Sequence, residues 1–76
     1  MSVMEQCMVW LVEFLQEAGG PVRPVEAVHE AEKLGFSHRQ VYRARKRLGE
    51  RVGSTLGFKN PDNCWQLVED EEEQAG

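Results

Sequence analysis

The stretch that decides the fold runs from residue 36 to residue 49 and reads FSHRQVYRARKRLG. Ser37 and Gln40 have the spacing of a capping box, in which the serine oxygen accepts from the Gln40 N–H and the glutamine side chain bonds back to the backbone. Gly49 ends the helix. Between these signals the apolar residues recur at helical spacing, as Val41, Ala44 and Leu48. We therefore expect a helix from about Ser37 to Leu48 with one narrow buried stripe.

A second helix is expected immediately before this one. Pro24 suits a first helical position, because its missing N–H would have no partner there, and Gly35 closes the helix. The predicted buried face follows steps of three residues and comprises Val25, Val28, Ala31 and Leu34, with Glu26, Glu30 and Glu32 in water. Two helices joined by a tight turn that contains glycine form a helix-turn-helix unit.

A longer helix is expected from about Ser2 to Ala18, where Gly19-Gly20-Pro21 ends it. Its apolar stripe comprises Met4, Met8, Leu11, Leu15 and Ala18, widened by Cys7 and Phe14. Val22-Arg23 then forms a short extended link that could be no more than an edge strand.

The C-terminal part predicts a β-hairpin with strands from Arg51 to Leu56 and from Asn63 to Val68. Residues 57–63, GFKNPDN, are rich in turn formers. Helix, extended link, helix, helix and hairpin is the order of a winged helix-turn-helix, an α+β fold in which the hairpin is the wing. We expect this domain to span residues 1–68, and residues 69–76 to form a disordered acidic tail.

Length and composition exclude several classes of protein. The 76 residues suffice for one small domain. The chain lacks the run of roughly 18 apolar residues that a membrane span needs and the start of a secretory signal, so we expect a cytoplasmic protein. Cys7, Cys64, His29 and His38 have no metal-site spacing, and both cysteines are expected to be reduced packing residues. With no phosphate-binding glycine loop and no nucleophile beside a base, we expect neither an enzyme nor a cofactor.

The distribution of charge is more informative than its total of −4. Acids outnumber bases in residues 1–36 and in residues 60–76. The block from residue 37 to residue 59 instead contains one acid, Glu50, and seven bases, which are Arg39, Arg43, Arg45, Lys46, Arg47, Arg51 and Lys59. Such an asymmetry keeps an acidic partner such as nucleic acid open despite the overall negative charge.

The third predicted helix carries most of the candidate binding residues. At about 100° per residue, Arg39, Arg43 and Lys46 lie opposite the apolar stripe, with Tyr42 and Arg47 on its flanks. Arg45 falls near the apolar edge, and we expect its side chain to extend outward. Arginine can grip phosphates or pair with guanine, and a tyrosine hydroxyl can bond a phosphate. Lys59 and Asn60, at the predicted hairpin tip, could contact the DNA backbone or minor groove. The alternative is a solvated face whose arginines pair with glutamates of the first two helices.

The segment from Trp10 to Leu67 resembles the small winged-helix domain that follows the ATPase module in RecA-like ATPases of plasmid and phage replication. The resemblance lies in FLQEAGGPV, in PVEAVHEAEKLGFSHRQVYRARKRLG and in GFKNPDNCWQL. It implies that the helix from Gln40 to Leu48 is a recognition helix and that Gly57 to Asn63 is the wing. No ATPase module precedes this domain here, so the chain is either such a domain alone or a free-standing relative, such as one from a mobile element.

The sequence therefore predicts a small transcription or replication regulator that binds double-stranded DNA. Its third helix would lie in the major groove and its hairpin would act as the wing. The main alternative is a winged helix that docks on a polymerase, a helicase, a RecA-like ATPase or a similar protein, with Trp10 as a contact. An acidic mimic of DNA is disfavoured by the basic block. Winged helices often act as dimers, and no heptad or self-complementary patch here decides between a monomer and a homodimer.

Overall fold

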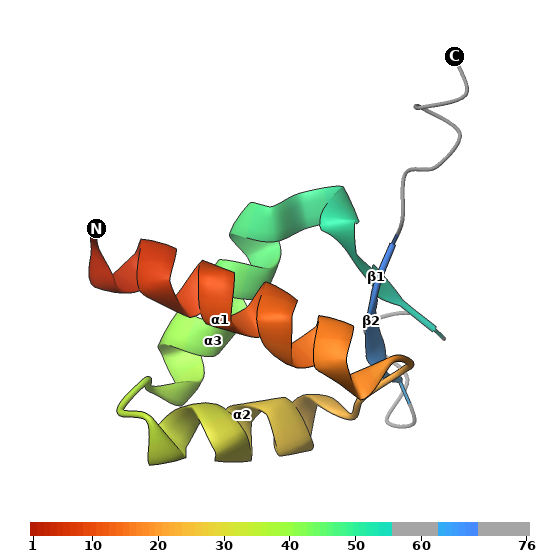
Figure 1. Ribbon diagram of the computed structural model, residues 1–76, viewed down its shortest axis with the longest axis horizontal. Helices are drawn as coiled ribbons and strands as arrows, with labels where there is room; N and C mark the ends of the chain where they lie inside the picture. The colour runs from red at the N-terminus through yellow and green to blue at the C-terminus, as the bar shows by residue number, and fades with distance from the viewer. Residues whose placement is uncertain (56–62, 69–76) are drawn as a thin grey trace.

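The computed structural model describes residues 1–55 and 63–68. Its elements follow in the order α1 (Val3–Ala18), α2 (Pro24–Lys33), α3 (His38–Leu48), a 3-10 turn (Gly49–Arg51), β1 (Val52–Ser54) and β2 (Trp65–Leu67). Three helices followed by a two-stranded antiparallel hairpin form the predicted α+β arrangement, with the layout of a winged helix (Figure 1). Among the described residues, no helix combines the length and the apolar character needed to cross a membrane.

Local signals in the sequence set the helix boundaries. The Ser37 hydroxyl accepts from the Gln40 N–H at 3.1 Å, and the Ser37 N–H donates to Gln40 Oε1 at 2.8 Å, which confirms the predicted capping box. Ser2 and Glu5 form a second capping box at the start of α1. Gly19 ends α1 in the left-handed conformation, with φ of 70°, where a residue with a Cβ would be strained.

The hairpin is paired over most of its predicted length, although its regular strands are shorter than predicted. Val52 faces Leu67 and Ser54 faces Trp65 in the antiparallel register. Two further backbone hydrogen bonds extend the pairing, from the Thr55 N–H to the Cys64 oxygen and from the Val68 N–H to the Arg51 oxygen. Arg51 itself belongs to the 3-10 turn, and Leu56 lies outside the described residues.

The predicted extended link at Val22 becomes part of this sheet. Val22 and Trp65 exchange both backbone hydrogen bonds, with N···O distances of 2.8 and 2.7 Å. A single bridge therefore attaches the segment between α1 and α2 to β2, on the side of β2 away from β1. This bridge ties the helical part of the domain to the hairpin.

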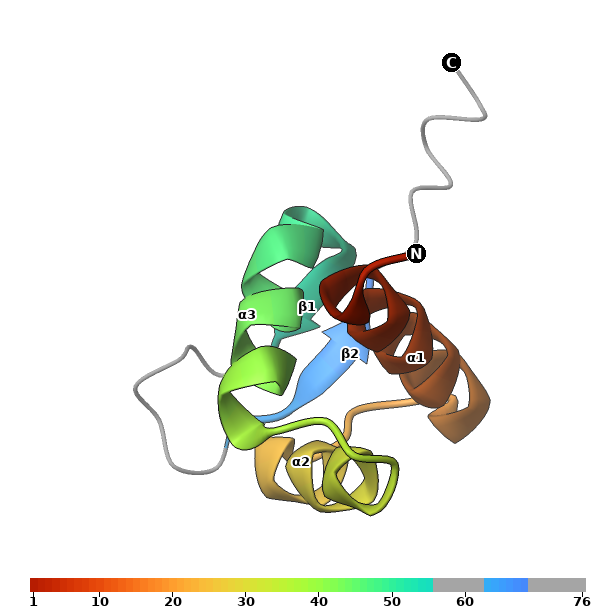
Figure 2. The ribbon, with the colours of Figure 1, turned by 90° about the vertical axis from the view of Figure 1, so that its left-hand side faces the viewer.

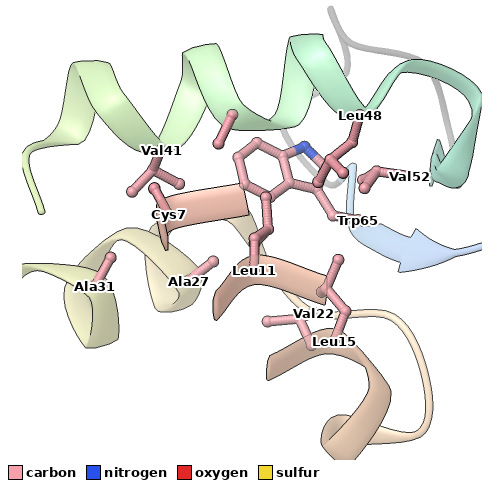
Figure 3. Close-up of a cluster of buried hydrophobic side chains, with 11 residues drawn as sticks. Cys7, Leu11, Leu15, Val22, Ala27, Ala31, Val41, Leu48, Val52 and Trp65 are labelled. Carbon is pink, nitrogen blue, oxygen red and sulfur yellow. The ribbon is translucent and has the colours of Figure 1, made fainter. Parts of the chain in front are cut away.

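The core lies where α1, α3 and β2 meet. Figure 3 shows the Trp65 indole beneath α3, with Leu11 of α1 on its other side, and Trp65 is only 1% exposed. The buried apolar residues are Cys7, Leu11, Leu15, Val22, Ala27, Ala31, Val41, Ala44, Leu48, Val52 and Trp65. Burial raises the pKa of the Cys7 thiol, as expected for a cysteine that acts as a packing residue.

The predicted buried face of α2 is confirmed at Ala31, which is buried, and at Val28, which packs against the core, but it is wrong at Val25 and Leu34. Val25 is 68% exposed and Leu34 is 62% exposed, whereas Ala27 and Ala31 are buried. Leu34 is exposed because it is the C-cap residue, just after α2 ends at Lys33. Val25 is exposed because it lies about 200° around the helix from the buried Ala27. Ala18 was also expected in a buried stripe, but it is exposed at the end of α1.

Candidate nucleic-acid interface

Helix α3 separates its apolar and charged residues onto opposite sides. Val41, Ala44 and Leu48 are buried, and α3 packs mainly on α1. Figure 2 shows α1 and α3 side by side, with the hairpin behind them and α2 below. The side of α3 that faces away from α1 is therefore left to solvent, as the helical spacing predicted.

The exposed side of α3 contains an open hollow. We call this cavity the α3 hollow. Its lining residues are His38, Arg39, Tyr42, Arg43 and Lys46. The structure thus brings together Arg39, Tyr42, Arg43 and Lys46 of the predicted site. At about 1.5 Å per residue, the cations from Arg39 to Lys46 extend over about 10 Å of the helix axis.

Tyr42 is held in place by contacts on two sides. Its ring meets the buried Trp65 ring edge-on, with centroids 5.2 Å apart and planes at 80°. The His38 ring lies 4.7 Å from it on the same helix. An edge-to-face contact with a core residue restrains a side chain that is otherwise 40% exposed. Tyr42 therefore links the core to the exposed surface of α3.

Arg45 differs from its sequence-based prediction. Its side chain was expected to extend outward, but the guanidinium Cζ lies 5.9 Å from the centroid of the Trp65 ring. A cation is attracted to the electron-rich face of an indole, and the methylene stem of Arg45 can pack beside the apolar stripe. Arg45 thus contributes to the junction between α3 and β2 and lies outside the lining of the α3 hollow.

The remaining cations of α3 are available for a partner. Within residues 1–55 and 63–68, no carboxylate forms an ion pair with Arg39, Arg43, Lys46 or Arg47, and the ion pair found there joins Lys33 to Glu30 at 3.2 Å. The predicted alternative, in which glutamates of α1 and α2 neutralise these arginines, is therefore not formed in this part of the chain. A cluster of unpaired like charges favours an anionic partner.

The other predicted site residues do not line the α3 hollow or lie outside the described residues. Arg47 is exposed on α3 but does not line the hollow. Lys59 and Asn60 lie outside the described residues, as does the predicted tail at residues 69–76. His38 was not among the predicted site residues, although its position four residues before Tyr42 puts both rings on one side of the helix.

Hydrogen bonds close the hairpin next to α3. The Ser54 hydroxyl donates to Asn63 Oδ1, and the Cys64 N–H donates to Thr55 Oγ1 at 3.0 Å. Ser54 is the register partner of Trp65, and the Trp65 ring touches Tyr42. Through Trp65, the paired residues at the Ser54 end of the hairpin therefore lie next to Tyr42 of α3.

A second surface lies along α1. It is an apolar groove, which we call the α1 groove, and Met8, Val9 and Val12 are among its apolar lining residues; the others that line it are Met1, Glu5, Glu13, Gln16, Leu48 and Arg51. Trp10, predicted as a partner contact, does not line this groove. It is half-buried, and its ring stacks on Phe14 at 5.1 Å and lies 6.1 Å from Phe36.

The described residues, 1–55 and 63–68, were also compared with the requirements of a metal site. There, no group of three or more His, Cys, Asp or Glu side chains could hold a metal ion. Comparisons with protein-family models, with curated proteins and with solved structures found no match for this chain. The candidate function therefore rests on the chain's own fold and surface chemistry.

Proposed function

We propose that this protein is a winged-helix module that binds double-stranded DNA, with α3 as the recognition helix. The observation that carries the proposal is the exposed side of α3, where Arg39, Arg43 and Lys46 lie together without carboxylate partners among residues 1–55 and 63–68. Guanidinium and ammonium groups are the side chains that most often contact phosphates and guanine edges. The resemblance that the sequence shows to the winged-helix domains of replication ATPases favours replication as the setting of this binding.

The dimensions of the domain suit this role. The major groove is about 12 Å wide and admits one α-helix, and α3 projects its cations from the side that no other described element covers. Trp65, the first residue of β2, contacts Tyr42, so a wing formed by this hairpin would lie next to the recognition helix and not on the opposite face. Both parts of the domain could then contact one duplex.

The experiment compares two arginine variants in a DNA-binding titration at low salt. Arg43→Ala removes a cation from the α3 hollow and should weaken binding by about 1–3 kcal/mol if the side chain reaches a base edge. Arg51→Ala is the matched control for the loss of one positive charge, because Arg51 lines the α1 groove and does not line the α3 hollow. Equal affinity of wild type and a folded Arg43→Ala protein would refute the role of α3.

The α1 groove favours a second candidate function, which is docking on a protein of the nucleic-acid machinery. Its apolar lining includes Met8, Val9 and Val12, and an amphipathic helix can bind to a groove of this type. The two functions differ in their response to salt, because binding through phosphates weakens steeply as salt rises. Failure of the protein to bind heparin or nonspecific DNA at low salt would favour docking over DNA binding.

A further inference from the structure

The α3 hollow has an unexpected lining for a cationic surface. Arg39, Arg43 and Lys46 supply three of its five residues, yet its surface is largely carbon. Carbon atoms of the two aromatic residues, His38 and Tyr42, and of the side-chain stems of the three cations therefore account for most of its lining. Apolar surface and three cations thus occur together on the side of α3 that we propose as the recognition surface.

The Tyr42 side chain in the lining of the hollow is restrained by neighbouring rings. Trp65 supports the Tyr42 ring from the core, and His38 restrains it from the preceding turn of α3. A side chain that is already fixed loses little conformational entropy when a ligand binds. Such a surface can discriminate between ligand groups that differ by a single methyl.

The chemistry of the major groove identifies the group that fits. Base edges in this groove present hydrogen-bond donors and acceptors, and the one apolar group among them is the C5 methyl of thymine. A polar base edge placed against carbon would lose hydrogen bonds to water without replacement. A methyl group loses none and gains from its removal from water.

We propose that the α3 hollow binds the C5 methyl group of thymine, so that this protein prefers sites with an A·T pair opposite His38 and Tyr42. The inference rests on the proposed function and specifies which base edge the recognition helix reads. In this arrangement Arg39, Arg43 and Lys46 bind phosphates or neighbouring guanines, and the two rings supply the sequence preference. The division of roles follows from the composition of the hollow, which combines three cations with an exposed lining that is largely carbon.

The test uses two duplexes that differ only in this methyl group. One contains alternating dA and dT, and the other has deoxyuridine at every thymidine position. Their affinities for the wild-type protein are measured by fluorescence anisotropy at low salt. Burial of one methyl group predicts about fourfold weaker binding of the deoxyuridine duplex for each thymine contacted.

The outcomes separate this inference from the proposed function. Salt-sensitive binding of both duplexes with equal affinity would refute the thymine contact and leave DNA binding intact. Failure to bind either duplex would refute DNA binding itself. Tighter binding of single-stranded oligothymidine than of the duplex would refute the placement of the methyl group in a major groove.

Variants of the α3 hollow then test whether its residues cause any difference in affinity between the two duplexes. His38→Ala and Tyr42→Ser each remove one aromatic side chain from the lining of the hollow, and both should bring the ratio of the two affinities closer to one. Tyr42→Phe keeps the ring and should keep the ratio. Arg47 does not line the hollow, so Arg47→Ala should weaken binding of both duplexes by the same factor. Circular dichroism checks the fold of each variant, and an unchanged ratio in folded His38→Ala and Tyr42→Ser proteins would overturn the assignment.

Discussion

Trp65 offers the sharpest test of how the fold supports the candidate site. The indole is 1% exposed, contacts the Tyr42 ring edge-on and lies under the Arg45 guanidinium. Trp65→Leu would keep a buried apolar side chain and the backbone hydrogen bonds to Val22, but it would remove the two contacts that need the ring, with Tyr42 and with Arg45. The change therefore isolates what the aromatic ring contributes to stability.

The magnitude follows from these contacts. Complete truncation of a buried tryptophan costs about 3–5 kcal/mol, of which leucine recovers part by filling some of the space. The aromatic pair contributes about 0.5–1.5 kcal/mol and the cation–π contact about 0.5–1 kcal/mol. We expect Trp65→Leu to lower the free energy of unfolding by about 2–4 kcal/mol. At about 0.05–0.15 kcal/mol per residue, this is a large fraction of the total for a domain of this size.

The assay is urea unfolding followed by far-UV circular dichroism, with Trp10→Leu as the matched control. Trp10 is half-buried and stacks on Phe14 at the edge of the core, so the same chemical change there should cost only about 1 kcal/mol. A loss of stability in Trp65→Leu no larger than that in Trp10→Leu would refute the position assigned to Trp65 at the centre of the domain.

Two further predictions concern the helices. Ser37→Ala removes the hydroxyl that accepts from the Gln40 N–H and should cost about 1 kcal/mol in urea unfolding; no measurable loss would mean that the capping box does not stabilise α3. Leu48→Ala should cost roughly 2–5 kcal/mol because Leu48 is buried at the end of α3, whereas Leu34→Ala, at a residue 62% exposed, should change stability by less than about 0.5 kcal/mol. Thermal melting of this pair decides between the observed burial and the burial that the sequence suggested for α2.

Signals within one helix were sufficient to predict α3. The capping box at Ser37, the stripe of Val41, Ala44 and Leu48, and the stop at Gly49 all depend on residues close together in the sequence. The same spacing predicted that Arg39, Arg43 and Lys46 share one side of the helix. The buried stripe fixes which side faces the core, and these three residues lie opposite it.

Features that depend on contacts between distant segments could not be predicted in the same way. Ala27 is buried in α2 although alanine is weakly apolar, and the larger Val25 is exposed, because the packing of α2 against its neighbours sets its rotation. Leu34 is exposed because α2 ends one residue before it. The bridge between Val22 and Trp65 joins residues far apart in the chain. The position of Arg45 over the indole depends in turn on where β2 lies under α3.

The most direct test of the recognition role of α3 is an NMR titration of the 15N-labelled protein with a short DNA duplex at low salt. The account predicts the largest amide shift changes at His38, Arg39, Tyr42, Arg43 and Lys46, with little change at Met8, Val9 and Val12 in the α1 groove, and a reversal of these changes as salt is raised. Shift changes concentrated in the α1 groove, or none on α3 when the duplex is in excess, would contradict it.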